Sequence, residues 1–177
     1  MIALSKPVIG NEEKKAVMRV LDSGMIAQGP EVEAFENEFS LLMEGHHCIA
    51  VNSGTSALLL GLLASGIECG HEVIIPSFTF AATANAVSLC GATPVFVDID
   101  INTFTMDPIA VEAAITKNTS AIMPVHLYGH PAHMDPLTEI CAKNGLMLLE
   151  DAAQAHLATY KSQPVGTFGT AAFSFYP

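Results

Sequence analysis

The sequence predicts an α/β fold in which a mainly parallel, doubly wound sheet is covered by helices on both faces. Short apolar runs alternate with stretches of helical spacing along most of the chain. These runs lack the alternation of apolar and polar residues that a half-exposed strand shows, which is typical of strands buried on both faces. Breaks such as Cys90-Gly91 and Asn144-Gly145 separate the helical stretches from the apolar runs that follow them.

Two helices are expected before the first strand. One runs from Asn11 to Ser23, with Asn11 as the N-cap, two glutamates in the first turn and Gly24 just after the end. The next begins at Pro30, carries apolar residues at helical spacing and ends before Gly45. The remaining elements alternate. We expect strands at Cys48–Val51, Glu72–Ile75, Pro94–Val97, Ala121–His126 and Leu146–Glu150, and helices at Thr55–Ser65, Thr79–Cys90, Asp107–Ile115 and Asp135–Asn144.

Composition excludes several classes of protein. Hydrophobic residues make up 50% of the 177 and charged residues 14%, which argues against disorder and coiled coil.

The dense apolar stretch Ala57–Ala64 is too short to cross a bilayer, and no basic segment precedes an apolar one at the start. We therefore expect a cytoplasmic protein without a membrane segment. The net charge of −11 excludes nucleic acid as a partner. Without repeats or linkers, the chain is expected to form one domain.

Neither the cysteines nor the histidines favour a metal site. The four cysteines lack zinc or redox spacing and are interpreted as buried free thiols, as in a reducing compartment. His126, His130 and His133 stand near Asp135 in a loop that contains glycine and proline, without helical ligand spacing. We therefore predict no metal.

Polar and small residues follow every predicted strand, and in parallel sheets such residues converge on one edge. Asn52-Ser53-Gly54-Thr55-Ser56 leads into an apolar helix whose first N–H groups can bind an anion. Gly54 would let a phosphate approach, and Thr55 and Ser56 add hydroxyls; the alternative is ordinary capping by Ser53. No Walker loop and no dinucleotide-binding glycine motif is present.

Asp151, Gln154 and Phe80 are further candidates at strand ends. A carboxylate such as Asp151 keeps a pyridine nitrogen protonated, because an opposite charge raises the pKa of that nitrogen. The alternative for Asp151 is capping of a helix. Phe80 can stack on a flat ring, although most phenylalanines in apolar settings belong to the core.

Taken in order, these motifs resemble those of a known protein family, and the resemblance extends from Pro7 to Pro177. The segments Leu21–Gly24, Val51–Leu58, Glu72–Phe80, Gly91–Asp98, Pro124–Gly129, Glu150–Gln154 and Phe173–Phe175 resemble the N-terminal part of the DegT/DnrJ/EryC1/StrS nucleotide-sugar aminotransferases. These are fold-type I enzymes that depend on pyridoxal 5'-phosphate. The resemblance implies that residues 1–177 form the N-terminal part of the cofactor-binding large domain, without the small C-terminal domain.

The resemblance also implies roles for single residues. Thr55 and Ser56, next to Gly54, would hold the cofactor phosphate with their amides, helped by Ser174. Phe80 would stack on the pyridine ring. Asp151 would pair with the ring nitrogen and sustain the electron sink. Gln154 would lie near the phenolic oxygen of the ring.

The family's Schiff-base lysine follows the equivalent of Ser174 by about five residues, which is beyond Pro177. Lys161, the only lysine after Asp151, stands in a turn-forming segment, so the chain as given is expected not to catalyse transamination alone. The resemblance implies transfer of an amino group, typically from glutamate, to a nucleotide-linked keto-sugar by a homodimer. Two alternatives stay open: a sugar dehydratase with histidine in place of that lysine, and a non-catalytic truncated paralogue.

Overall fold

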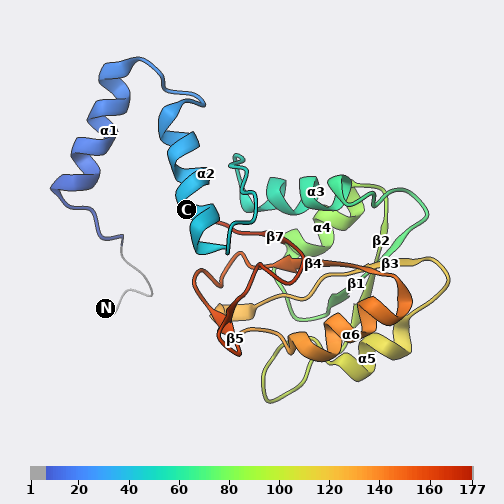
Figure 1. The fold of residues 1–177 in the computed structure, drawn as a ribbon. Coiled ribbons are helices and arrows are strands. Elements are labelled where there is room, and N and C mark those ends of the chain that lie inside the picture. Colours follow the sequence, from blue (N-terminus) through green and yellow to red (C-terminus); the bar gives the residue numbers. More distant parts are fainter. Residues whose placement is uncertain (1–6, 177) are drawn as a thin grey trace, which may run out of the picture.

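A five-stranded parallel sheet forms the centre of the protein (Figure 1). The computed structural model describes residues 7–176. The strands follow the order β2-β1-β3-β4-β7, so the chain reverses its direction of winding between β1 and β3. Their bounds are β1 Glu72–Pro76, β2 Thr93–Val97, β3 Thr119–Ile122, β4 Met147–Asp151 and β7 Thr170–Ala172. A small antiparallel pair, β5 (Thr159–Tyr160) and β6 (Gln163–Pro164), lies between β4 and β7 in sequence.

Helices cover both faces of the sheet, which confirms the predicted doubly wound α/β fold (Figure 1). α3 (Gly54–Ala64) and α4 (Ala81–Leu89) pack on one face, against Val73 and Ile75 of β1. α5 (Pro108–Ala114) and α6 (Met134–Asn144) pack on the other, against Ile74. Successive residues of β1 therefore enter two different cores, which explains why the strand sequences show no polar face.

The two N-terminal helices have the predicted bounds but bury no residue. α1 (Asn11–Ser23) and α2 (Pro30–Leu42) extend away from the sheet (Figure 1). Gly24 ends α1 in the left-handed conformation, with φ 72°, as expected. The N-cap is Gly10 rather than Asn11, and Glu13 accepts a 2.6 Å hydrogen bond from the Gly10 N–H.

The predicted strand Cys48–Val51 is wrong. The segment belongs to no sheet, and the Ala50 N–H donates instead to Glu36 of α2 at 2.7 Å. A strand needs a second strand with which it can form hydrogen bonds, and within residues 7–176 this segment pairs with none. Strand Ala121–His126 is also too long, because β3 ends at Ile122 and only Val125 forms an isolated bridge, with Asp151.

The cysteines are free, as expected, but only Cys141 is buried, while Cys69 is exposed. Within residues 7–176, no helix combines the length and the apolar character needed to cross a bilayer. The first six residues, which the expectation about a basic segment at the start concerns, lie outside the described residues. Pro177, where the expected family resemblance ends, also lies outside them.

Candidate active site

The carboxyl ends of β4 and β7 bring several candidate residues to one edge of the sheet. β4 ends at Asp151, which is in register with Ala172 of β7, and the Ala152 N–H donates to the Ala172 carbonyl at 2.9 Å. Ser174 follows two residues later. Because both strands run in the same direction, Asp151 and Ser174 leave the sheet at the same edge.

Gly54 and Ser174 are in close contact at the start of α3. A Cβ atom on Gly54 would lie 2.7 Å from the Ser174 Cβ and 3.0 Å from its Oγ, so only glycine fits there. Ser53 caps α3, since its Oγ accepts the Ser56 N–H at 3.1 Å. This cap occupies the Ser56 amide, so the expectation that this amide binds a phosphate is wrong, and it leaves the earlier amides of Gly54 and Thr55 for another acceptor. Capping and anion binding are therefore compatible at this turn.

Asp151 is a buried carboxylate, 4% exposed. Its Oδ2 accepts a 2.7 Å hydrogen bond from the Thr83 hydroxyl of α4, and its Oδ1 accepts the Ala153 N–H at 3.2 Å. Burial raises the pKa of Asp151 above its ordinary value, and the two hydrogen bonds oppose this only in part. The alternative role as a helix cap is not borne out, because a turn follows Asp151 rather than a helix.

Phe80 occupies the N-cap position of α4, three residues before Thr83, and its side chain is 70% exposed. The alternative of a core phenylalanine is therefore wrong. The Thr79 hydroxyl lies 2.8 Å from that of Thr83, which extends the Thr83–Asp151 contact to the start of the helix. Thr83 was missed by sequence reasoning, because a threonine inside a helical stretch carries no distinguishing signal.

Gln154 holds the loop that follows β3. Its Oε1 accepts the Tyr128 N–H at 2.8 Å, and Tyr128 adopts a left-handed conformation with φ 53°. Since the carbonyl oxygen of Gln154 is occupied by this N–H, the amide nitrogen remains as the group that donates to a ligand.

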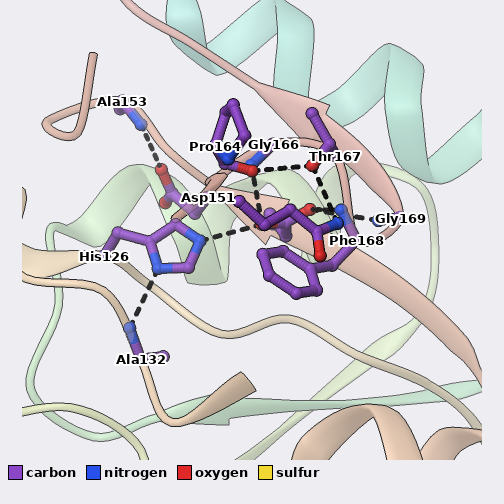
Figure 2. Close-up of polar contacts among 11 residues, drawn as sticks. His126, Ala132, Asp151, Ala153, Pro164, Gly166, Thr167, Phe168 and Gly169 are labelled. Carbon is purple, nitrogen blue, oxygen red and sulfur yellow. Dashed lines mark hydrogen bonds and ion pairs between the residues drawn. The ribbon is translucent and has the colours of Figure 1, made fainter. Parts of the chain in front are cut away.

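His126 and Glu150 form a fully buried pair beside Asp151. The His126 Nε2 lies 3.1 Å from Glu150 Oε2, while its Nδ1 accepts the Ala132 N–H at 3.0 Å. Figure 2 shows His126, Asp151 and the segment Gly166–Gly169 gathered in one place. Sequence analysis missed Glu150; its one signal was a charged residue inside an otherwise apolar strand.

A cavity of about 500 Å³ adjoins the start of α3. Its lining residues include Phe35 and Phe39 of α2 as well as Asn52–Gly54 and Ser174. Asp151, Phe80 and Gln154 are not among its lining residues. The candidate residues therefore share an edge of the sheet, but only Gly54 and Ser174 border this cavity.

Other expectations for this region can be compared with the structure. No group of three histidine, cysteine or acidic side chains suited to a metal ion occurs among the described residues. Lys161 is exposed, with φ 50°, and its ammonium pairs with Asp135, in keeping with the predicted turn.

Comparison with known proteins extends over almost the whole chain. Residues 7–177 match the DegT/DnrJ/EryC1/StrS aminotransferase family. The chain is 52% identical over 167 residues to dTDP-3-amino-3,4,6-trideoxy-alpha-D-glucose transaminase of Streptomyces venezuelae, covering 94% of the chain and 44% of that protein. It is 48% identical over 173 residues to the spore coat polysaccharide biosynthesis protein SpsC of Bacillus subtilis, covering 97% of the chain and 44% of the relative.

Solved structures show the same likeness. DesV of S. venezuelae superposes with a TM-score of 0.92 at 52% identity, covering 94% of this chain and 45% of DesV. The PLP-form of a putative sugar aminotransferase from Streptococcus pneumoniae gives a TM-score of 0.94 at 35% identity, covering 99% of this chain and 49% of that one. The chain thus spans less than half the length of these relatives. From its sequence and its fold, the chain belongs to the DegT/DnrJ/EryC1/StrS aminotransferase family.

Proposed function

We propose that the protein binds pyridoxal 5'-phosphate and transfers an amino group, from a donor such as glutamate, to a nucleotide-linked keto-sugar in amino-sugar biosynthesis. The observation that carries this proposal is the buried Asp151, fixed by Thr83 at the same sheet edge as the Gly54–Ser174 contact. Relatives support it, since one is a transaminase for a dTDP-linked amino sugar and another was solved in a PLP-form.

The chemistry of Asp151 fits the ring of this cofactor. Two neutral donors hold its carboxylate, and burial raises its pKa, so its negative charge is not fully compensated. A protonated pyridine nitrogen would supply the missing positive charge. The pKa of that nitrogen would then rise, because the nearby carboxylate favours its protonated form. The Thr83 bond directs one carboxylate oxygen and the Ala153 bond the other, so the side chain stays in place when a ring is absent.

The start of α3 fits the phosphate. The amides of Gly54 and Thr55 lie at the positive end of the helix, where a dianion is stabilised. Ser174 touches Gly54, so its hydroxyl is placed to donate to the same anion. The proposed phosphate site thus consists of Gly54, Thr55, Ser174 and Ser56. The Ser56 hydroxyl lies 3.0 Å from that of Ser53.

Two further side chains complete the proposed ring site. The exposed Phe80 offers an aromatic face at the start of α4, next to the Thr79–Thr83–Asp151 contacts. Gln154 offers its amide N–H₂, directed by the Tyr128 bond, to the phenolic oxygen. When bound, the cofactor supplies the electron sink that stabilises a substrate carbanion. The protein's part is to hold the ring and keep its nitrogen protonated.

We also propose that the protein works as a cytoplasmic homodimer. α1 carries large apolar side chains without a buried position, including Val17, Met18 and Leu21, each more than half exposed. Such unpartnered apolar residues are typical of a surface that is covered in an assembly.

The experiment combines cofactor binding with amino transfer. Pyridoxal 5'-phosphate is titrated into the purified protein and its absorbance followed, and the protein is then given 15N-glutamate and a dTDP-linked keto-sugar. We expect saturable binding both by the 177 residues and by the complete gene product, and a 15N-labelled amino sugar from the complete gene product. Binding by the complete gene product without any transfer to a keto-sugar would argue for the non-catalytic alternative, and no binding would contradict the proposal.

A further inference from the structure

Glu150 is surrounded by hydrogen-bond donors from two different parts of the chain. Its Oε1 accepts the N–H groups of Phe168 at 2.9 Å and Gly169 at 3.0 Å. Its Oε2 accepts the N–H of Gly166 at 2.7 Å and lies 3.1 Å from Nε2 of His126. Three backbone N–H groups and the imidazole of His126 therefore surround the two side-chain oxygens of Glu150, which act as acceptors.

The tautomer of His126 follows from the same set of contacts. Its Nδ1 accepts the Ala132 N–H at 3.0 Å and therefore carries no proton. The ring proton is on Nε2, which donates to Glu150. In addition, the backbone N–H of His126 donates to the backbone carbonyl of Asp151 at 3.1 Å. His126 thus links Glu150, Asp151 and the backbone of Ala132.

The segment bound by Glu150 leads directly into the strand that places Ser174. Gly169 precedes Thr170, the first residue of β7, and β7 pairs with β4 from Leu149↔Thr170 to Asp151↔Ala172. Gly169 has no room for a side chain, because a Cβ there would lie 2.2 Å from the Leu148 carbonyl oxygen. The close approach of Gly169 to β4 and the bonds to Glu150 together determine where β7 begins.

We propose that Glu150 is a positioning residue: its carboxylate holds the Gly166–Gly169 segment, and through β7 it sets Ser174 against Gly54 as part of the phosphate-binding turn. Through His126 the same carboxylate steadies the Val125–Ala132 loop on the other side of Asp151. Glu150 itself does not touch the cofactor. This inference rests on the proposed function, because it assigns the Gly54–Ser174 contact to a phosphate.

The predicted consequence is selective. If Glu150 acts through Ser174, its loss weakens contacts with the phosphate more than contacts with the ring. A purely structural role would lower the fraction of folded protein and affect all ligands equally. The ratio of the Kd of pyridoxal, which lacks the phosphate, to the Kd of pyridoxal 5'-phosphate separates the two cases.

Two variants and one control test this with the protein as it exists. In Glu150→Gln an amide N–H₂ replaces one acceptor oxygen and faces N–H donors. Glu150→Asp keeps the charge but is too short to reach all four partners. Glu112→Gln, which removes an exposed carboxylate paired with Lys143, is the matched control. We expect the Kd ratio, measured by calorimetry, to fall at least tenfold in both Glu150 variants and to stay unchanged in the control.

A second readout needs no cofactor. Amide hydrogen exchange at Gly166, Phe168 and Gly169 should accelerate at least tenfold in Glu150→Asp, while the amides of α6 keep their wild-type rates. A folded Glu150 variant with a wild-type Kd ratio overturns the inference, as does a failure of both variants to fold. Wild-type protein that does not prefer pyridoxal 5'-phosphate over pyridoxal contradicts the proposed function instead, and hydrogen exchange then decides on Glu150.

Discussion

The hydroxyl of Thr83 donates a 2.7 Å hydrogen bond to Oδ2 of Asp151, although the two residues are 68 positions apart. The contact joins the first turn of α4 to the end of β4 and fixes a carboxylate that is almost completely buried. Since the direction of winding reverses between β1 and β3, helix starts and strand ends from both halves of the sheet meet here. The contact is therefore a product of topology as much as of two side chains.

Replacing Thr83 by valine should lower the free energy of unfolding by about 1–3 kcal/mol, because the buried Oδ2 of Asp151 loses its donor. Valine keeps the shape of the side chain, so packing changes little. Chemical denaturation measures the effect. Thr79→Val is the control, since the Thr79 hydroxyl contacts Thr83 but not Asp151. An equal loss in both variants would contradict a specific role for the Thr83–Asp151 bond.

In the complete gene product, Asp151→Asn should leave the fold nearly intact and reduce turnover by orders of magnitude. The asparagine oxygen can still accept the Ala153 N–H, and its N–H₂ can donate to the Thr83 hydroxyl, which then donates to Thr79. Only the charge that keeps the pyridine nitrogen protonated is lost. Steady-state kinetics and thermal unfolding check both parts. If turnover stays within about tenfold, or roughly 1.4 kcal/mol in barrier, Asp151 is not the partner of the ring.

The stability of the protein without cofactor should depend on pH through Asp151. Burial raises the pKa of this carboxyl above its ordinary value of 3.8. The protonated form is therefore favoured in the folded state, and its stabilising effect is complete below pH 3.8 and is lost as the pH rises through the folded-state pKa.

Unfolding free energies of the wild type and Asp151→Asn measured from pH 3.5 upward test this prediction. The difference, wild type minus variant, should fall with increasing pH and then become constant. Asparagine does not titrate, so other groups cancel in the difference. A difference that increases with pH would mean that the pKa of Asp151 is lowered in the folded protein.

Gly54→Ala should destabilise the start of α3 and weaken phosphate binding. The added Cβ would lie 2.7 Å from the Ser174 Cβ, so one of the two segments must move, at a cost of about 1–3 kcal/mol. Gly61→Ala in the middle of the same helix is the control, because its nearest contact, at 3.3 Å, is the flexible end of Leu149. In Gly54→Ala combined with Ser174→Gly, the stability loss should be smaller than the sum of the single losses. Additive losses would show that the two positions do not touch.

The sheet and its helices were predictable because their signals are local. β1 and β4 are apolar runs whose side chains enter two cores, and the glycine at the end of α1 marks that end by its conformation. Cys48–Val51 has an equally apolar sequence, but a strand also depends on a neighbour, which the sequence of the segment does not specify. The local pattern alone was therefore insufficient there.

The candidate site was predictable only as a set of strand ends. Asp151 and Gln154 follow the buried strand β4, so the sheet edge at which they lie followed from the parallel topology. Ser53–Ser56 follow a segment that belongs to no sheet, and the contact of Gly54 with Ser174 places them at that edge. The partners that hold these residues did not follow from the topology, because Thr83–Asp151 and His126–Glu150 join residues 68 and 24 positions apart. His126 illustrates the difficulty: its sequence neighbours suggested a metal loop as an alternative, whereas the structure gives both ring nitrogens a protein partner.

Lys161 should not form a stoichiometric adduct with the cofactor. Its ammonium is exposed and paired with Asp135, and the positive charge is favoured by this pair, which raises the pKa of the lysine. A lysine that attacks an aldehyde must be deprotonated, so this environment opposes the reaction. The 177-residue chain is mixed with pyridoxal 5'-phosphate, reduced with borohydride and digested, and the peptides are analysed by mass spectrometry. We expect no more than trace labelling of Lys161, comparable with that of Lys117, and no amino transfer to a keto-sugar. A single stoichiometric label on Lys161 that Lys161→Arg abolishes, together with measurable transfer, would show that this turn lysine carries the cofactor.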